Sequence, residues 1–300
     1  MLVALAGCGN STPAASNPTY PATGLVLLSL TDGTKRAAAS IGTDPVAVVV
    51  SNDGTTAYLA DSSPGDVYAV TLPDLKVAWK QHVGGAPFGL LLHAGSLFVS
   101  LFSSAAVVEL DPATGTPLGS HPVPQGPAVM SVDAGGHVVV AGTRGQVNYL
   151  DGTATRAGHG FGIAVVNGQV WTADYERAEL VPAGDDHRVG LPLPVFPFWL
   201  AAGTGGNLLV AAEGAREDGD PGGVFSFDTA TAKFTTLGRP RDPDQVLQAG
   251  SIILVASHGD RDVLAIEGDR TSAWAPGAAA VAIAADPSLK LLVVVVNEHE

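Results

Sequence analysis

A phrase of about forty residues recurs along the chain, and this repeat constrains the fold more than any other feature. Each copy contains a Pro or a Gly, a run of small apolar residues, a tight turn and a second apolar run. Copies begin at Pro45, Pro87, Pro127, Gly160, Pro197 and Pro243, and a looser copy begins near Ala279. A period of this length is typical of repeat proteins in which each unit buries its apolar residues against its neighbours.

Every copy carries the signals of β-hairpins. Residue pairs that tolerate a positive φ angle separate the two apolar runs, namely Asp53-Gly54, Ala94-Gly95, Gly135-Gly136 and Asn167-Gly168. A second hairpin usually follows, as in residues 67–76 and 106–116. No segment has a sustained apolar stripe with the 3.6-residue period of a helix, so we expect no long helix. Four strands in a unit of this length predict one blade of a β-propeller.

The two ends of the chain complete this count. The seventh copy stops after two strands, at residues 297–300, and residues 24–35 form a lone hairpin with no first hairpin before it. Joined in space, the two halves make one blade, which removes exposed sheet edges. We therefore predict an all-β, seven-bladed β-propeller over residues 24–300, with four-stranded antiparallel blades and a ring that the N-terminal strands close by completing the last blade.

Composition narrows the function classes. Of the 300 residues, 46% are hydrophobic and 15% are charged, so the chain is not disordered. A net charge of −14 argues against a nucleic-acid partner, because little positive charge is available for phosphates. No apolar window is long enough for a transmembrane helix. The single cysteine, Cys8, excludes a disulfide framework and a cysteine-based zinc site. We predict no cofactor and no metal.

The residues before the repeat resemble a bacterial lipoprotein signal. Leu5-Ala6-Gly7-Cys8 is similar to a lipobox, and this resemblance implies that Cys8 carries lipid and that the protein is extracytoplasmic. On this interpretation, residues 1–8 are the last part of a truncated signal. We expect its basic part to lie upstream, because no Lys or Arg precedes Lys35. Residues 9–23, rich in Ser, Thr, Pro and Ala, suit a flexible tether. The alternative is an apolar tail with a chance cysteine.

The repeat itself resembles the YVTN and NHL-type repeats of bacterial β-propellers. Residues 44–48 (Asp-Pro-Val-Ala-Val), 53–60 (Asp-Gly-Thr-Thr-Ala-Tyr-Leu-Ala) and 110–115 (Leu-Asp-Pro-Ala-Thr-Gly) carry the resemblance, which loosely covers residues 24–300. Such propellers include extracytoplasmic binding proteins, surface proteins and a few lactone hydrolases or lyases. The resemblance therefore implies the fold and leaves binding and catalysis as alternatives.

Propeller topology divides the loops between two faces. We call the face with the second-to-third turns and the blade links the link face, and the opposite face the turn face. Acidic residues outnumber basic ones in the link-face loops, which favours cationic ligands, metal ions or basic partners. The alternative is that the strands are apolar, so the charged residues can lie only in the loops. We predict a ligand-binding face that includes Asp61, Asp174, Tyr175, Glu176, Arg177, Glu213, His258, Asp260, Arg261, Asp262, Glu298 and His299.

Four groups of residues on the link face suggest particular roles. A divalent cation could be ligated by His258, Asp260, Asp262, Glu298 and His299, although solvated polar loops are the favoured interpretation. Tyr175 with its charged neighbours could contact a sugar or peptide, unless Arg177 simply pairs with Glu176 or Glu213. The loop 213–223 carries calcium-like carboxylates at positions 217, 218 and 220 without the EF-hand order, and a mobile acidic loop is favoured. The aromatic link 192–199 either covers a seam between blades or lines the channel mouth, and we favour the seam.

No nucleophile motif or nucleotide-binding fingerprint is present. We predict a monomeric, lipid-anchored binding protein of the bacterial cell envelope, periplasmic or surface-exposed, whose partner is an envelope protein, a peptide or a small ligand. The alternative is a lactonase- or lyase-type enzyme, with or without a metal ion that assists it, which requires His and carboxylate side chains to converge at the channel mouth. A purely structural envelope protein is a third alternative, and it predicts no pocket.

Overall fold

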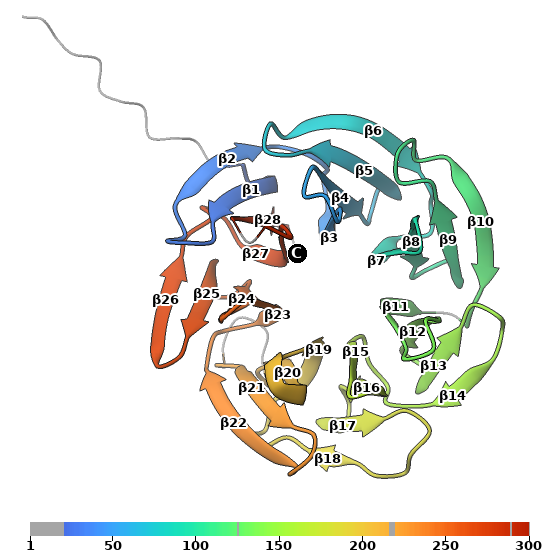
Figure 1. The fold of residues 1–300 in the computed structure, drawn as a ribbon, viewed down its shortest axis with the longest axis vertical. Coiled ribbons are helices and arrows are strands. Elements are labelled where there is room, and N and C mark those ends of the chain that lie inside the picture. Colours follow the sequence, from blue (N-terminus) through green and yellow to red (C-terminus); the bar gives the residue numbers. More distant parts are fainter. Residues whose placement is uncertain (1–20, 125, 216–219, 289, 300) are drawn as a thin grey trace, which may run out of the picture.

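A computed structural model describes residues 21–124, 126–215, 220–288 and 290–299, and within these ranges the chain forms seven four-stranded sheets. Figure 1 shows the sheets arranged as a ring, with the first strand of each blade nearest to the centre and the fourth at the outside. The predicted seven-bladed, antiparallel propeller is confirmed. Cys8, the lipobox and residues 9–20 of the predicted tether lie outside the described residues, as do residues 216–219 of the acidic loop and residue 300.

Strands follow one another from the centre of each blade outward, and blades follow one another around the ring. Blades 1 to 3 consist of β3 (Pro45–Val50), β4 (Thr56–Asp61), β5 (Asp66–Thr71), β6 (Lys76–His82), β7 (Pro87–His93), β8 (Ser96–Leu101), β9 (Ala106–Leu110), β10 (Pro117–Pro122), β11 (Pro127–Val132), β12 (Val138–Gly142), β13 (Gln146–Tyr149) and β14 (Ala154–Arg156). Blades 4 to 6 consist of β15 (Ile163–Val166), β16 (Gln169–Asp174), β17 (Glu179–Pro182), β18 (Val189–Gly190), β19 (Phe196–Ala202), β20 (Asn207–Glu213), β21 (Gly223–Asp228), β22 (Lys233–Gly238), β23 (Pro243–Ala249), β24 (Ile252–Ser257), β25 (Asp262–Glu267) and β26 (Arg270–Trp274). A short 3-10 helix, η1 (Thr204–Gly206), connects β19 and β20, and no helix in the described part of the chain has the length and apolar character needed to cross a membrane.

Blade 7 joins the two ends of the chain. Its strand order is β27 (Ala280–Ala285), β28 (Leu291–Asn297), β1 (Thr23–Ser29) and β2 (Lys35–Ala39). β1 and β28 pair along their whole length, from Thr23 opposite Asn297 to Ser29 opposite Leu291. The N-terminal hairpin therefore completes the blade that the C-terminal hairpin begins, as the sequence predicted.

The core is divided among the seams between blades. Seven clusters of buried apolar side chains are found, and each combines residues of two adjacent blades. β28 shows how one strand serves two seams: Leu292, Val294 and Val296 pack against blade 6, whereas Val293 and Val295 pack against blade 1. Because both faces of each sheet are covered, inner strands such as β3 and β27 are continuously apolar instead of alternating with polar residues.

Hairpin turns on the turn face use aspartates as local hydrogen-bond acceptors. The Oδ1 atom of Asp53 accepts hydrogen bonds from the Ser51 hydroxyl (2.6 Å) and from the backbone N–H of Thr55 (3.0 Å). These bonds, the one from the Ser51 side chain above all, lower the pKa of Asp53. Asp32 and Asp151 make similar bonds to the threonine two residues later. The acidic residues of these turns thus have a structural use.

We predict that Leu27→Ala, which removes a fully buried side chain from the seam between blades 7 and 1, lowers the free energy of unfolding by about 2–5 kcal/mol. The matched control is Leu118→Ala, since Leu118 has the same side chain at 57% exposure, and it should change the free energy by no more than about 0.5 kcal/mol. Urea denaturation measures both changes. Equal losses in the two variants would show that the seam does not carry the stability of the ring.

Candidate functional site

The central channel opens on the link face, where the innermost strand of each blade begins. Just inside this opening is a cavity of about 40 Å³, lined by Val46, Phe88, Phe198, Trp199, Asp244 and Val281. A deeper cavity of about 90 Å³ is lined by residues further along the inner strands, and Trp199 lines it too. Trp199 therefore borders both cavities. We call this opening the channel mouth.

One side of the channel mouth is aromatic. Phe88 lies with its ring centroid 5.8 Å from that of Phe102 and 5.6 Å from that of Phe161. The ring centroid of Phe161 is in turn 5.2 Å from that of Phe198. Phe88 and Phe198 lie near the start of the inner strands β7 and β19, whereas Phe102 follows β8 and Phe161 precedes β15; all four rings are partly exposed. We call Phe88, Phe102, Phe161 and Phe198 the aromatic wall.

Next to the aromatic wall, the channel mouth is acidic. Glu213, at the end of β20, and Asp242 and Asp244, at the start of β23, place one carboxylate oxygen each within 4.8 Å of one another. The Tyr175 hydroxyl donates a hydrogen bond to Glu213 (2.6 Å), and Nδ1 of His258 lies 3.3 Å from a carboxylate oxygen of Asp242. We call Glu213, Asp242 and Asp244 the mouth carboxylates. Oxygen donors in this arrangement suit a cation, and the adjacent rings suit an organic one.

Two of the predicted site residues have structural roles instead. Asp61 is fully buried, and its carboxylate accepts hydrogen bonds from the backbone N–H groups of Thr43 (3.0 Å) and Asp44 (2.6 Å) in the link to blade 1. Asp174 is also fully buried, and it pairs with Arg177 (3.1 Å) and Arg188 (3.0 Å). Arg177 thus forms a structural ion pair, as the alternative had it, and the partner found is Asp174, where the sequence had suggested Glu176 or Glu213. Glu176 itself is exposed in the turn after β16.

The five residues considered for a divalent cation are not gathered into one group. Asp260 accepts a hydrogen bond from the backbone N–H of Arg241 (2.8 Å), and the backbone N–H of His299 donates to Asn297 (3.0 Å). Glu298 forms a two-pronged ion pair with Arg261, whose hydrogen bonds lower the pKa of that carboxyl. Within the described ranges, the only three metal-ligating side chains close enough to share an ion are the mouth carboxylates.

Sequence reasoning missed Asp242 and Asp244, although a signal was present. The residue after the strand-opening proline lines the channel in several blades and is apolar there, as in Pro45-Val46, Pro87-Phe88 and Pro197-Phe198. In blade 6 the same position is Pro243-Asp244, so a charge replaces an apolar side chain at the channel axis.

The aromatic link 192–199 serves both of the roles that were considered. Val195 packs in the seam between blades 4 and 5, as favoured, whereas Phe198 and Trp199 line the channel. Phe196 also stacks on Tyr175, with ring centroids 5.3 Å apart. This one short segment therefore contacts the seam, contacts Tyr175, whose hydroxyl donates to Glu213, and contributes Phe198 to the aromatic wall.

Asp66 and Asp262 occupy the same position, the first residue of the third strand, in blades 1 and 6. Burial opposes the ionisation of Asp66, but hydrogen bonds from Lys80 and His82 hold its pKa below its usual value. In blade 6, the position that is equivalent to Lys80 in the strand register is occupied by Ala273. Burial, and then the nearby Asp260, raise the pKa of Asp262 to about 6. This predicted site residue is thus an acid whose ionisation the fold disfavours.

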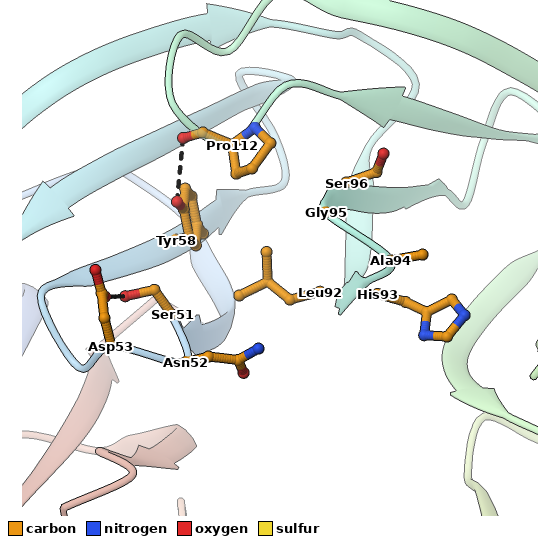
Figure 2. A pocket seen from close by; sticks show the side chains of 10 residues that line it. All are labelled: Ser51, Asn52, Asp53, Tyr58, Leu92, His93, Ala94, Gly95, Ser96 and Pro112. Carbon is orange, nitrogen blue, oxygen red and sulfur yellow. Dashed lines mark hydrogen bonds between the residues drawn. The ribbon is translucent and has the colours of Figure 1, made fainter.

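A larger hollow of about 450 Å³ lies on the turn face, between blades 1 and 2. Figure 2 shows hydrogen bonds among its lining residues: Ser51 donates to Asp53, and the Tyr58 hydroxyl donates to the carbonyl oxygen of Pro112 (3.1 Å). The Ser96 hydroxyl at its edge donates to Glu109 (2.5 Å). The hollow follows from hairpin geometry, and the channel mouth is the stronger candidate site.

We predict that Asp262→Asn raises the free energy of unfolding at pH 7 by about 1–2 kcal/mol. This is less than the free energy that the full pKa shift would give, because water screens a partly exposed group. An unfolded Asp titrates near 3.8, so the cost of ionising Asp262 in the fold develops between about pH 4 and pH 6. The gain should therefore vanish near pH 4. Urea denaturation at both pH values measures it, and Asp66→Asn, which removes a paired carboxylate, should instead destabilise the protein at pH 7.

No protein-family model matches the sequence, and no curated protein matches it. Many solved structures share the fold. A chain of hydrazine synthase from Kuenenia stuttgartiensis is 14% identical, with 86% of this chain and 97% of that chain covered and a TM-score of 0.67. BamB from Moraxella catarrhalis is 16% identical (93% and 93% covered, TM-score 0.56), and the periplasmic gluconolactonase PpgL of Pseudomonas aeruginosa is 12% identical (92% and 97%, TM-score 0.61). At these identities the likeness shows the seven-bladed propeller fold.

Proposed function

We propose that the chain is an extracytoplasmic binding protein that takes a basic partner on its link face, at the channel mouth. The observation that carries this proposal is the meeting of the mouth carboxylates and the aromatic wall around one opening of a rigid ring. Irregular loops on a rigid scaffold are favourable places for recognition, since the scaffold fixes the side chains before the partner arrives.

The arginines strengthen the case, because several of them are engaged with other partners than the mouth carboxylates. Arg177 and Arg188 pair with Asp174, and Arg261 pairs with Glu298. Arg239 donates to the backbone carbonyl oxygen of Gly222. Together with the net charge of −14, this arrangement favours a negative potential that attracts cationic groups.

The rest of the proposal concerns location and family. The lipobox-like residues 5–8 support a lipid anchor on Cys8, and the likeness to a periplasmic propeller is consistent with an envelope location. We assign the repeat to the YVTN and NHL type on the phrases at residues 44–60 and 110–115. The partner is an envelope protein or peptide, and the chain acts as a monomer, since one chain closes the ring by building blade 7 from its own two ends.

The enzyme alternative has one observation in its favour. His258 and the mouth carboxylates converge at the channel mouth, where a lactonase- or lyase-type site would need acid–base groups, and one structure with this fold is a gluconolactonase. Hydrolysis of a panel of sugar lactones by the unaltered chain, lost on neutralising the mouth carboxylates, would favour catalysis over binding. A chain that binds basic peptides and hydrolyses no lactone would favour the binding protein.

We predict that the triple variant E213Q/D242N/D244N binds fluorescein-labelled decalysine at least about tenfold more weakly than the full chain does, because close charge pairs contribute about 1.5 kcal/mol or more. Fluorescence anisotropy of the Cys8→Ser chain measures this at low and at physiological salt. The matched control D74N/D185N/D269N removes three exposed carboxylates from the turn face and should bind almost as well as the parent. Equal losses of affinity in both triple variants would show that binding depends on net charge alone and would contradict a site at the channel mouth.

We predict that the chain, expressed in a bacterium behind a complete lipoprotein signal, incorporates an alkyne-labelled fatty acid and fractionates with membranes. Cys8→Ser should lose the label completely and move to the soluble fraction, since the acyl chains supply the membrane affinity. Label retained by the Cys8→Ser chain would contradict the lipid anchor on Cys8 and would leave the binding proposal unaffected.

A further inference from the structure

Blade 2 carries a wholly apolar side chain at a link-face position that is polar or glycine in every other blade. The first residue after the second strand is Phe102 in blade 2. In blades 1, 3, 4, 5, 6 and 7 it is Ser62, Thr143, Tyr175, Gly214, His258 and Glu298. The propeller therefore does not need an apolar ring in this turn. Because Phe102 is also partly exposed, a contact with another molecule would explain it better than packing does.

Phe102 lines a hollow of about 300 Å³ between blades 2 and 3, together with Ser103, Gly126, Thr143 and Arg144. We call it the link-face hollow. Its apolar surface is the Phe102 ring, whereas Ser103 and Thr143 bring hydroxyl groups that can bond to a peptide backbone. Binding pockets commonly combine apolar surface with a few polar groups in this way, so the hollow suits one apolar side chain of a peptide.

The rest of the aromatic wall supports the Phe102 ring. The ring centroid of Phe102 is 6.0 Å from that of Phe161, with the two planes 22° apart, and 5.8 Å from that of Phe88. Phe161 is itself held against blade 5, since a Cβ atom on the adjacent Gly162 would lie only 2.7 Å from the carbonyl oxygen of Phe198. Because only glycine permits this approach, the wall is in place before a partner arrives, which lowers the cost of binding.

The surroundings of the hollow select the kind of side chain. An aromatic ring gains from contact with the Phe102 ring beyond the area that it buries. Arg144 borders the hollow, and a guanidinium can stack on an aromatic ring while its N–H groups bond to other partners. The aromatic wall also continues to the channel cavity, which Phe88 and Phe198 line together with Asp244. A segment on the wall would thus extend from the hollow to the acidic side of the channel mouth.

Building on the proposed function, we propose that the basic partner inserts an aromatic side chain into the link-face hollow, against Phe102. This ring would be the anchor of the interface, because aromatic side chains in well-packed pockets contribute much of the binding energy. Basic residues beside the anchor would lie over the aromatic wall and toward the mouth carboxylates. The partner segment would therefore combine one aromatic residue with a positive charge on its flank.

The test uses three nine-residue peptides, each with four lysines on either side of a central residue. That residue is 4-fluorophenylalanine, leucine or alanine, so the three peptides have equal net charge. Isothermal titration calorimetry with the full Cys8→Ser chain measures the affinities, and fluorine NMR follows the aromatic peptide. We expect the aromatic peptide to bind at least about tenfold more tightly than the alanine peptide and about threefold more tightly than the leucine peptide. Its fluorine resonance should shift on binding.

Variants locate the effect. Phe102→Ser gives blade 2 the residue that blade 1 has at this position, and it should weaken the aromatic peptide about fivefold or more. It should also abolish the fluorine shift and leave the alanine peptide unchanged. The matched control is Leu118→Ser, which removes an exposed apolar side chain from the outer strand of the same blade and should change no affinity. Thermal unfolding shows whether each variant is folded.

Other outcomes overturn the inference and keep it apart from the proposed function. Equal affinities of the aromatic and alanine peptides, both lost in E213Q/D242N/D244N, would remove the anchor and leave the proposed function standing. A preference for the aromatic peptide that persists in Phe102→Ser would contradict the link-face hollow, and equal binding of the leucine peptide would contradict the aromatic side chain. An unaltered chain that binds none of the peptides would remove the proposed function itself.

Two further measurements distinguish other occupants of the hollow. Sedimentation of the unaltered chain as a dimer, with monomers in Phe102→Ser, would assign the hollow to a second copy of the chain. Binding to phosphatidylcholine vesicles that is lost in the same variant would assign it to a lipid surface. Either result would overturn the inference. We expect a monomer and no vesicle binding for the Cys8→Ser chain.

Discussion

Every sheet of this protein must be covered on both faces, and the whole ring depends on that constraint. A four-stranded blade exposes two apolar surfaces, so it is stable only between two neighbours, and seven blades satisfy the requirement only if the last packs against the first. The pairing of β1 with β28 meets that condition by building blade 7 from both ends of the chain. The seams on either side of it contain the apolar side chains of these two strands on alternate faces.

In this ring, some charged side chains stabilise the fold, whereas others are available to a partner. On the turn face, aspartates such as Asp53 bond to the hairpins that contain them. On the link face, Asp61 and Asp174 are buried at strand ends, where they hold the backbone of a blade link or two arginines. A high acidic content is therefore largely an architectural requirement. The mouth carboxylates stand out because they come from two separate segments, the end of β20 and the start of β23, and meet beside the channel.

The repeat made the fold predictable, because its period, its turn residues and its truncated ends each describe one blade or its closure. The site was less predictable, because the link-face loops have no common pattern and their charges could be placed on a face but not within it. Asp61 and Asp174 were expected to contact a ligand, yet burial decides their role, and burial depends on how the link folds over the strand end. Asp66 and Asp262 make the same point: one position and one residue type have opposite pKa shifts, because only blade 1 supplies a lysine and a histidine across the sheet.

The register of β1 also fixes where the chain enters the ring. Thr23 lies opposite Asn297, the last residue of a second strand, and Ala22 accepts a hydrogen bond from the backbone N–H of Glu298. The N-terminal segment thus joins the propeller on the link face, the same face as the channel mouth. With a lipid on Cys8, the membrane attachment and the proposed binding site would share one side of the disc. A partner would then have to arrive through the gap between the propeller and the bilayer, so the length of the tether would determine how bulky that partner can be.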